Sequence, residues 1–192
     1  MTEKYSATED VSQALNEHVQ KQHTDKKPYE FLSAIPMGMF GGTNLDPVTY
    51  YREESPKPHW HVVTNGFNVA GFELTMRIPR DTKNPHPWPQ RVMQDMYAYI
   101  VSSNGIFVVN DYMAHTFDTP ESVRFTGALF VQDPSLPTYK AESEEVIFLQ
   151  IYPLTENELE KVKGDDYEAF IERVRTATNG FFVIDWNRAE IT

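Results

Sequence analysis

The sequence predicts an α+β domain whose helices pack on a mixed, largely antiparallel sheet. Several segments alternate apolar and polar residues with the two-residue period of a strand, and others place apolar residues at helical spacing. These two kinds of segment do not alternate strictly along the chain, which favours α+β over a parallel α/β arrangement. At 192 residues, the chain is expected to form one domain, 1–192.

A helix is the first predicted element, over residues 6–23. Ser6 and Glu9 have the spacing of a capping box, which satisfies free amide groups at a helix start. Every fourth residue along one side is apolar, namely Val11, Leu15 and Val19. The sequence DKKP at 25–28 ends the helix, so residues 1–33 form a lead-in to the domain core.

Strands are predicted next at 34–40 and 47–53, followed by an antiparallel pair at 58–65 and 71–78. In the last segment apolar and polar residues alternate, which is typical of a strand with one buried face and one face in solvent. The buried face would carry Phe72, Leu74, Met76 and Ile78, and the solvent face Glu73, Thr75 and Arg77.

A proline-rich loop at 79–89 leads into the clearest helical pattern, 89–104, whose two apolar stripes indicate a helix lying on a sheet. Thr155 and Glu158 form a second capping box. The remaining predicted elements are strands at 105–109, 124–131, 145–152 and 179–186 and helices at 155–163 and 165–178.

Composition excludes several classes of function. The chain has no cysteine, which excludes disulfides, thiolate metal sites and a cysteine nucleophile and suits a reducing compartment. It starts with MTEKYSATED, without the apolar stretch of a signal peptide, and no apolar run reaches the ~20 residues of a membrane helix. We therefore expect a cytoplasmic protein that does not act at a membrane.

Negative charge dominates the composition. The formal net charge is −11, and residues 118–192 hold 15 acidic and 7 basic side chains, a net charge of −8. Such a chain repels nucleic acid, so direct DNA or RNA binding is not expected. The charge either attracts a basic protein partner or only keeps the protein soluble.

Histidines in the segment HWH suggest a metal site. His59 and His61 lie on one side of a predicted strand, and Trp60 lies on the other. A third ligand, His86 or His115, would complete a zinc site and make the protein a metal-dependent hydrolase. The alternative is a pair of histidines that pack and form hydrogen bonds within the sheet, without a metal.

Acidic side chains cluster at two places. Asp165–Asp166 and the run Glu142, Glu144 and Glu145 suit acid–base chemistry or cation binding. They equally suit a solvated surface or a helix start, where carboxylates favour the helix dipole. Because the chain has no P-loop, GxGxxG, GxSxG or HExxH motif, we expect a binding protein rather than an enzyme, and no cofactor.

Several longer motifs follow one another in a fixed order. They are GGTNLDPVTYYRE, HWHVVTNGFN, GFELTMRI, PWPQRVMQDMYAYIVSS, a strand ending in QDP, VIFLQIYPLTENEL and FFVIDWNR. Together they resemble the suppressor of fused family, with residues 34–192 as the family core. Stand-alone members of this family resemble immunity proteins, which neutralise polymorphic toxins that often carry LXG-type delivery regions and nuclease tips.

The resemblance also implies partner-binding residues. The family's peptide groove uses a helix tyrosine and an aspartate further along, which match Tyr99 and Asp111. It also uses an acidic residue before Asp-Pro, where this chain has Gln132, so part of the groove's charge is lost. Animal members hold their peptide between this domain and a second one, so we expect that clamp to be incomplete in this chain and the partner to differ.

The family is not known for enzymes or metal proteins, so the resemblance implies that His59, Trp60 and His61 are structural. We predict an immunity protein that occludes a cognate toxin, a nuclease with a basic surface, and that uses Tyr99 as its buried anchor. The alternatives are a peptide-binding adaptor with a groove near Tyr99 and Asp111, and the metal-dependent hydrolase.

The acidic run is the expected site of electrostatic contact with the toxin. The predicted contact residues there are Glu142, Glu144 and Glu145.

Overall fold

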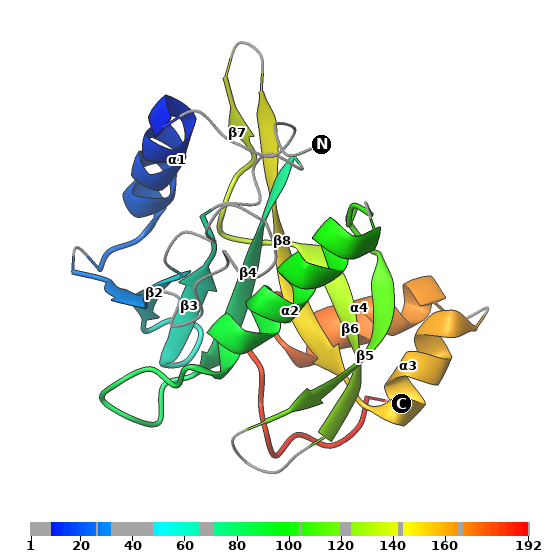
Figure 1. Cartoon of the computed structure of the whole chain (residues 1–192). Helices are drawn as coiled ribbons and strands as arrows, with labels where there is room; N and C mark the ends of the chain where they lie inside the picture. Colours follow the sequence, from blue (N-terminus) through cyan, green and yellow to red (C-terminus); the bar gives the residue numbers. More distant parts are fainter. Residues whose placement is uncertain are drawn as a thin grey trace.

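A sheet with helices on both of its faces forms the body of the protein (Figure 1). The computed structural model describes residues 9–25, 27–31, 48–65, 71–103, 105–119, 124–141, 144–164 and 167–191. The strand predicted at 34–40 and the capping residue Ser6 lie outside these ranges.

Eight strands and four helices make up the regular structure in the described part of the chain. The strands are β1 (Tyr29–Phe31), β2 (Val48–Glu53), β3 (His59–Val63), β4 (Phe72–Pro79), β5 (Tyr112–Asp118), β6 (Arg124–Gln132), β7 (Tyr139–Lys140) and β8 (Glu145–Leu154). The helices are α1 (Glu9–Gln22), α2 (Trp88–Ser103), α3 (Glu156–Lys163) and α4 (Tyr167–Ala177).

The sheet has the strand order β1-β2-β3-β4-β8-β6-β5, and β7 pairs with β8. Within the described residues, β4 and β8 run parallel and all the other paired strands run antiparallel. The predicted fold class is therefore confirmed, and so is the predicted β3–β4 antiparallel pair. The parallel pair arises because α2 and the β5–β6 hairpin separate β4 from β8 in the chain.

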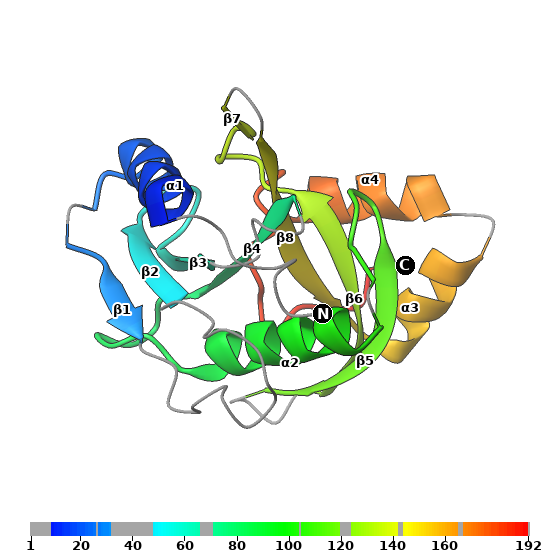
Figure 2. The same cartoon turned by 45° about the horizontal axis from the view of Figure 1, so that its top comes forward.

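Helices cover both faces of the sheet (Figure 2). α2 lies on one face, and α1 and α4 lie over different parts of the opposite face. Because strand side chains alternate between faces, Trp60 and Ile151 pack toward α2, whereas Tyr152 packs toward α3 and α4. Phe148 lies with Leu15 of α1 in a third apolar cluster.

The predicted helices are confirmed at all four places. Thr155 and Glu158 form the predicted capping box at the start of α3. On α4, Phe170, Ile171 and Val174 are buried, as their helical spacing indicates.

The prediction that β4 exposes one face is wrong. Glu73, Thr75 and Arg77 are buried along with the apolar side chains between them. β4 lies in the middle of the sheet, so both of its faces are covered by other parts of the protein. The polar side is satisfied internally: the Thr64 hydroxyl, for example, donates to the Glu73 carboxylate at 2.5 Å.

The prediction of strands at 105–109 and 179–186 is also wrong, because neither segment is a strand in the structure. In the first, a tight turn follows, with Asn110 at φ 69°. In the second, Asn179, Gly180 and Phe182 have positive φ values, which a strand does not accommodate. β5, which pairs with β6 at the edge of the sheet, is not predicted from the sequence, and neither are the short strands β1 and β7.

Candidate functional site

An ion pair between Arg77 and Asp133 lies at the centre of a buried polar network on the α1–α4 side of the sheet. Arg77 Nη2 donates to Asp133 Oδ1 at 2.8 Å, and Nη1 donates to Oδ2 at 2.9 Å. His61 Nε2 and the Thr75 hydroxyl donate to the same carboxylate at 2.9 and 2.6 Å. Arg77 also donates to the side-chain oxygen of Gln150.

Electrostatics keep this network charged. Burial alone would raise the pKa of Asp133, but Arg77 and His61 hold it well below its usual range. Burial, aided by Arg77, lowers the pKa of His61 to about 3, and burial lowers that of His59 to about 4. Both histidine side chains are about 1% exposed, so the network has no direct access to a substrate.

The histidines considered as metal ligands do not come together. His61 contacts Asp133 and His23, and His59 Nδ1 contacts the Lys57 carbonyl oxygen. The ring of His86 accepts from the Trp88 amide in the loop before α2. His115 lies on β5, which β4, β8 and β6 separate from β3. Among the described residues, no three histidine or carboxylate side chains are grouped as metal ligands.

Trp60 lies on the opposite side of β3 from the histidines, as strand alternation predicts. It is about 1% exposed and belongs to the core under α2. Tyr29 meets its ring edge-on at 5.5 Å, and the Arg52 guanidinium lies 5.4 Å from it. Its indole nitrogen has no hydrogen-bond partner among the described residues. These contacts support the structural interpretation of HWH, which stays a prediction.

Exposed apolar side chains gather where α2 ends and the chain turns into β5. We call this set the Tyr99 surface. Its members and their exposed fractions are Tyr99 45%, Ile106 64%, Val108 48% and Val109 39%. Tyr112 is also exposed, but it contacts Tyr167 of α4 on the other side of the sheet and is not part of this set. A monomer rarely leaves so many large apolar groups together in water unless the patch binds something.

The Tyr99 surface rests on a stack of buried rings. The Tyr99 ring stacks on Phe107 with centroids 5.8 Å apart, and Phe107 stacks on Phe130 of β6 at 4.0 Å. Phe107 also contacts Phe72 of β4 at 6.1 Å. The surface is therefore fixed to the central strands rather than carried on a free loop.

Asp111 shapes this surface. Its carboxylate accepts from the Val108 amide at 2.8 Å, and its backbone pairs with Phe130 of β6. The structure thus brings Tyr99 and Asp111 to one region, as the resemblance implies, although Asp111 is half-buried in its turn. Gln132 is exposed at the end of β6, two residues beyond Phe130 on the same side of the strand.

The described part of the acidic run lies elsewhere, on the hairpin formed by β7 and β8. Glu144 and Glu145 are exposed, and Glu145 pairs with Lys140 at 3.3 Å across the hairpin. Glu142 and the pair Asp165–Asp166 lie outside the described residues. Figure 1 shows the hairpin projecting beyond the sheet, away from α2.

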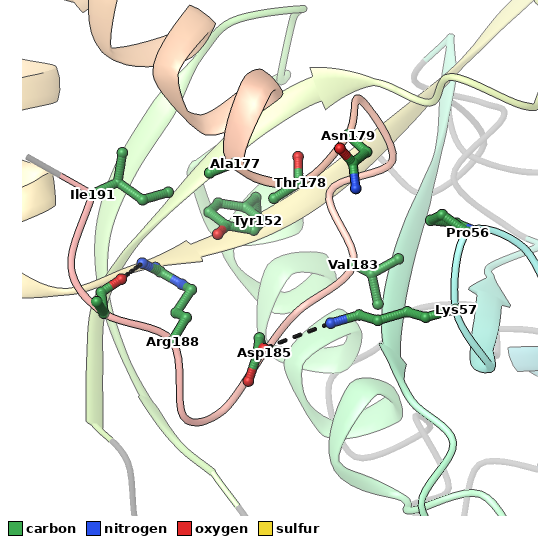
Figure 3. A pocket seen from close by; sticks show the side chains of 11 residues that line it. Pro56, Lys57, Tyr152, Ala177, Thr178, Asn179, Val183, Asp185, Arg188 and Ile191 are labelled. Atoms are coloured by element: carbon green, nitrogen blue, oxygen red, sulfur yellow. Dashed lines mark hydrogen bonds and ion pairs between the residues drawn. The ribbon is translucent and has the colours of Figure 1, made fainter.

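A cavity of about 320 Å³ lies under the C-terminal segment (Figure 3). Tyr152 of β8 and Arg188 line it, and Lys57 pairs with Asp185 across its edge at 3.6 Å. Arg188 donates two hydrogen bonds to the Glu158 carboxylate. Because these charges are already paired with one another, the cavity offers no unpaired ion to a charged ligand. None of the residues predicted to bind a partner lines it.

The buried roles of Arg77, Asp133 and His23 are not predicted from the sequence, although Arg77 and Asp133 each give a signal. An arginine on a strand that lies in the middle of a sheet covered on both faces needs a buried partner. The aspartate of the QDP segment supplies it. Ile106 and Val108 fall in the segment predicted as a strand, because an apolar run has the same pattern whether its side chains are buried or exposed.

Comparison with known proteins gives a consistent result. The family model described as "Suppressor of fused protein (SUFU)" matches residues 41–189. Suppressor of fused homologs of Mus musculus and Homo sapiens are each 28% identical over 193 aligned positions, which cover 85% of this chain. The chain spans about 40% of the length of either relative.

Solved structures show the same fold. A chain in the Sufu-Fu complex matches with a TM-score of 0.79 at 18% identity, covering 93% of this chain and 91% of that one. Drosophila Suppressor of Fused matches with a TM-score of 0.78 at 17% identity, covering 92% of this chain and 50% of that one. A putative homolog from Neisseria gonorrhoeae matches with a TM-score of 0.74 at 15% identity, covering 96% of this chain and 98% of that one. The family model spans most of the chain, and this chain therefore belongs to the suppressor of fused family.

Proposed function

We propose that this chain is an immunity protein, which binds a cognate polymorphic toxin in the cytoplasm and neutralises it by occlusion rather than by catalysis. The observation that carries the proposal is the Tyr99 surface, where four large apolar side chains are exposed at the turn after α2, with Tyr99 stacked on Phe107. Such a patch suits a protein partner, because burying it on association removes apolar area from water.

Tyr99 is the anchor of this interface. An aromatic side chain that is already held by stacking on Phe107 loses little conformational freedom on binding. Asp111 adds a carboxylate beside the apolar groups, whereas Gln132 lines a separate hollow with Arg175 of α4. The surface thus has an apolar centre with a carboxylate at its margin, and protein interfaces usually combine an apolar core with a polar rim.

The partner we propose is a nuclease toxin. A nuclease presents basic groups where it holds phosphates, and this chain carries a net charge of −11. Complementary charge speeds the encounter of two proteins, while apolar contacts hold the complex. Glu144 and Glu145 on the β7–β8 hairpin would contribute to this attraction from outside the Tyr99 surface, and the charge of Glu142 would add to it. No helix in the described part of the chain is both long and apolar enough to cross a bilayer.

The solved Sufu-Fu complex supports a binding role, because a chain with this fold is named there together with a partner. A peptide-binding adaptor with a groove near Tyr99 and Asp111 is the second candidate. It predicts binding of a short extended peptide without any protection against a toxin. A hydrolase built on His59 and His61 is not proposed, because these side chains are buried and bonded within the sheet.

Co-expression with the toxin domain encoded by the neighbouring gene tests the proposal. Cells should survive the toxin only when this protein is also made, and the purified pair should form a complex. Nuclease activity should fall in proportion to the amount of protein added and vanish at equimolar ratio. Absence of both protection and complex would overturn the proposal, and full inhibition at substoichiometric amounts would contradict occlusion.

A further inference from the structure

His23, the residue after the last residue of α1, is buried against the sheet. Its backbone amide bonds to the Gln20 carbonyl at 3.3 Å, and its ring Nδ1 lies 2.9 Å from the Val19 carbonyl oxygen. The ring therefore caps the end of the helix. Its other nitrogen, Nε2, lies 2.8 Å from Nδ1 of His61 on β3.

The three contacts of this histidine pair fix a proton count. The Val19 carbonyl oxygen and the Asp133 carboxylate can only accept, so His23 Nδ1 and His61 Nε2 must each carry a hydrogen. The contact between the two rings needs one more hydrogen. Two neutral imidazoles carry only two ring N–H hydrogens between them. One of the three contacts would then have a lone pair on each of its two atoms and no hydrogen between them.

The third hydrogen belongs on His23. Burial and Arg77 lower the pKa of His61 to about 3, which keeps that ring neutral and leaves its Nδ1 as the acceptor. His23 has surroundings that favour a cation. Its ring stacks on Tyr51 with centroids 3.7 Å apart, and it lies at the C-terminal end of α1, where the helix dipole is negative.

We propose that His23 is a buried imidazolium that fastens α1 to the sheet, and that loss of its extra proton loosens the helix. The helix contributes Leu15 and Val19 to the cluster that covers Val63 and Phe148. His23 is the polar attachment beside that cluster, joining α1 through His61 to the Asp133 carboxylate.

Charged groups of the described neighbouring elements bear on this proton. Asp133, Asp25 and Glu30 favour it by their negative charge, whereas Arg77 and Arg52 oppose it. Arg77 is itself paired with Asp133, and Arg52 with Asp25. Further titratable groups among the described residues are Tyr51 and Glu53 of β2 and His59 of β3.

The sign of the pH effect follows from the contacts. The folded protein holds the proton more tightly than the unfolded chain, whose imidazoles titrate at about 6.5. Stability from His23 is therefore fully present below that pH and is lost as the pH rises above it. At pH values where His23 is protonated in the folded state but not in the unfolded chain, the equilibrium constant for folding falls by up to about tenfold per pH unit.

Nitrogen-15 NMR of the full chain tests the charge state directly. At pH 7, the His23 ring should show hydrogens on both nitrogens, and the His61 ring should show one, on Nε2. A His23 ring with a single hydrogen at pH 7 would overturn the proposal. This measurement uses the wild-type protein, so it holds even if a variant does not fold.

Unfolding of His23→Gln tests the consequence. Between pH 6.5 and 8.5, the wild-type folding constant should fall relative to that of His23→Gln, whose side chain does not titrate. His18→Gln is the matched control, because His18 lies on the same helix but contacts Pro137 and not the network. An identical pH dependence for wild type and His23→Gln would also overturn the proposal.

Discussion

Arg77 and Asp133 form a two-armed ion pair inside the sheet, with nitrogen–oxygen distances of 2.8 and 2.9 Å. Both side chains are almost fully buried. The pair joins β4 to the turn after β6 and gathers His61, Thr75 and Gln150 around it. A central strand that carries polar residues on one side is stable in this sheet because each of these polar groups finds a partner in the network.

Asp133→Asn should destabilise the fold by about 3–5 kcal/mol, because it leaves the Arg77 guanidinium buried without its counter-charge. Urea unfolding measures the effect. Glu145→Gln is the matched control: it removes one partner of the exposed Lys140 pair and should change stability by less than about 1 kcal/mol. Equal effects of the two substitutions would contradict the importance assigned to the buried pair.

Asp133 should also make the protein sensitive to acid. Because its pKa lies well below the ordinary value in the folded state, its contribution is fully present above about pH 4 and is lost as the pH falls further. Between pH 5 and pH 2.5, wild type should therefore lose more unfolding free energy than Asp133→Asn. Parallel pH profiles for the two proteins would show that folding does not lower the pKa of Asp133, and would contradict this prediction.

Trp60→Ala should cost about 3–5 kcal/mol, because it empties a large site in the core under α2. Denaturant melts give this value, and intrinsic fluorescence of the remaining tryptophans follows the same transition. A loss below about 1 kcal/mol would mean that the site collapses without penalty and that Trp60 does not support the sheet.

Local patterns predicted the helices well, because a helix is specified by residues close in sequence. Thr155 and Glu158 are three positions apart and form the expected cap. The buried network was not predictable in this way, because Arg77 and Asp133 are 56 residues apart and His23 and His61 are 38 apart. Only strand order places them together, and the sequence pattern does not specify that order.

The place of the candidate site follows in part from the sequence, and its binding role stays a prediction. The resemblance pointed to Tyr99 and Asp111, which lie in one region of the structure. It did not point to Ile106 or Val108, whose apolar character suggested a strand. The Asp111 carboxylate instead bonds the Val108 amide in a tight turn, which leaves these side chains in solvent.

Association with a basic toxin should depend on salt. Raising the ionic strength from 0.01 to 0.15 M shortens the Debye length from about 30 to about 8 Å, so association should slow while dissociation changes less. Charge reversal of Glu142, Glu144 and Glu145 should slow association in the same way. Stopped-flow mixing measures both rates. A salt-independent association rate, with no effect of the triple reversal, would assign the negative charge to solubility alone.

The affinity of Tyr99→Ala for the cognate toxin tests the central claim most directly. Truncation of the anchor should weaken binding at least tenfold, or about 1.4 kcal/mol, while the free energy of unfolding changes little, because Tyr99 is 45% exposed. Lys163→Ala on α3 is the control and should bind like wild type. An unchanged dissociation constant for Tyr99→Ala, in titration calorimetry, would place the interface away from the Tyr99 surface and contradict the account.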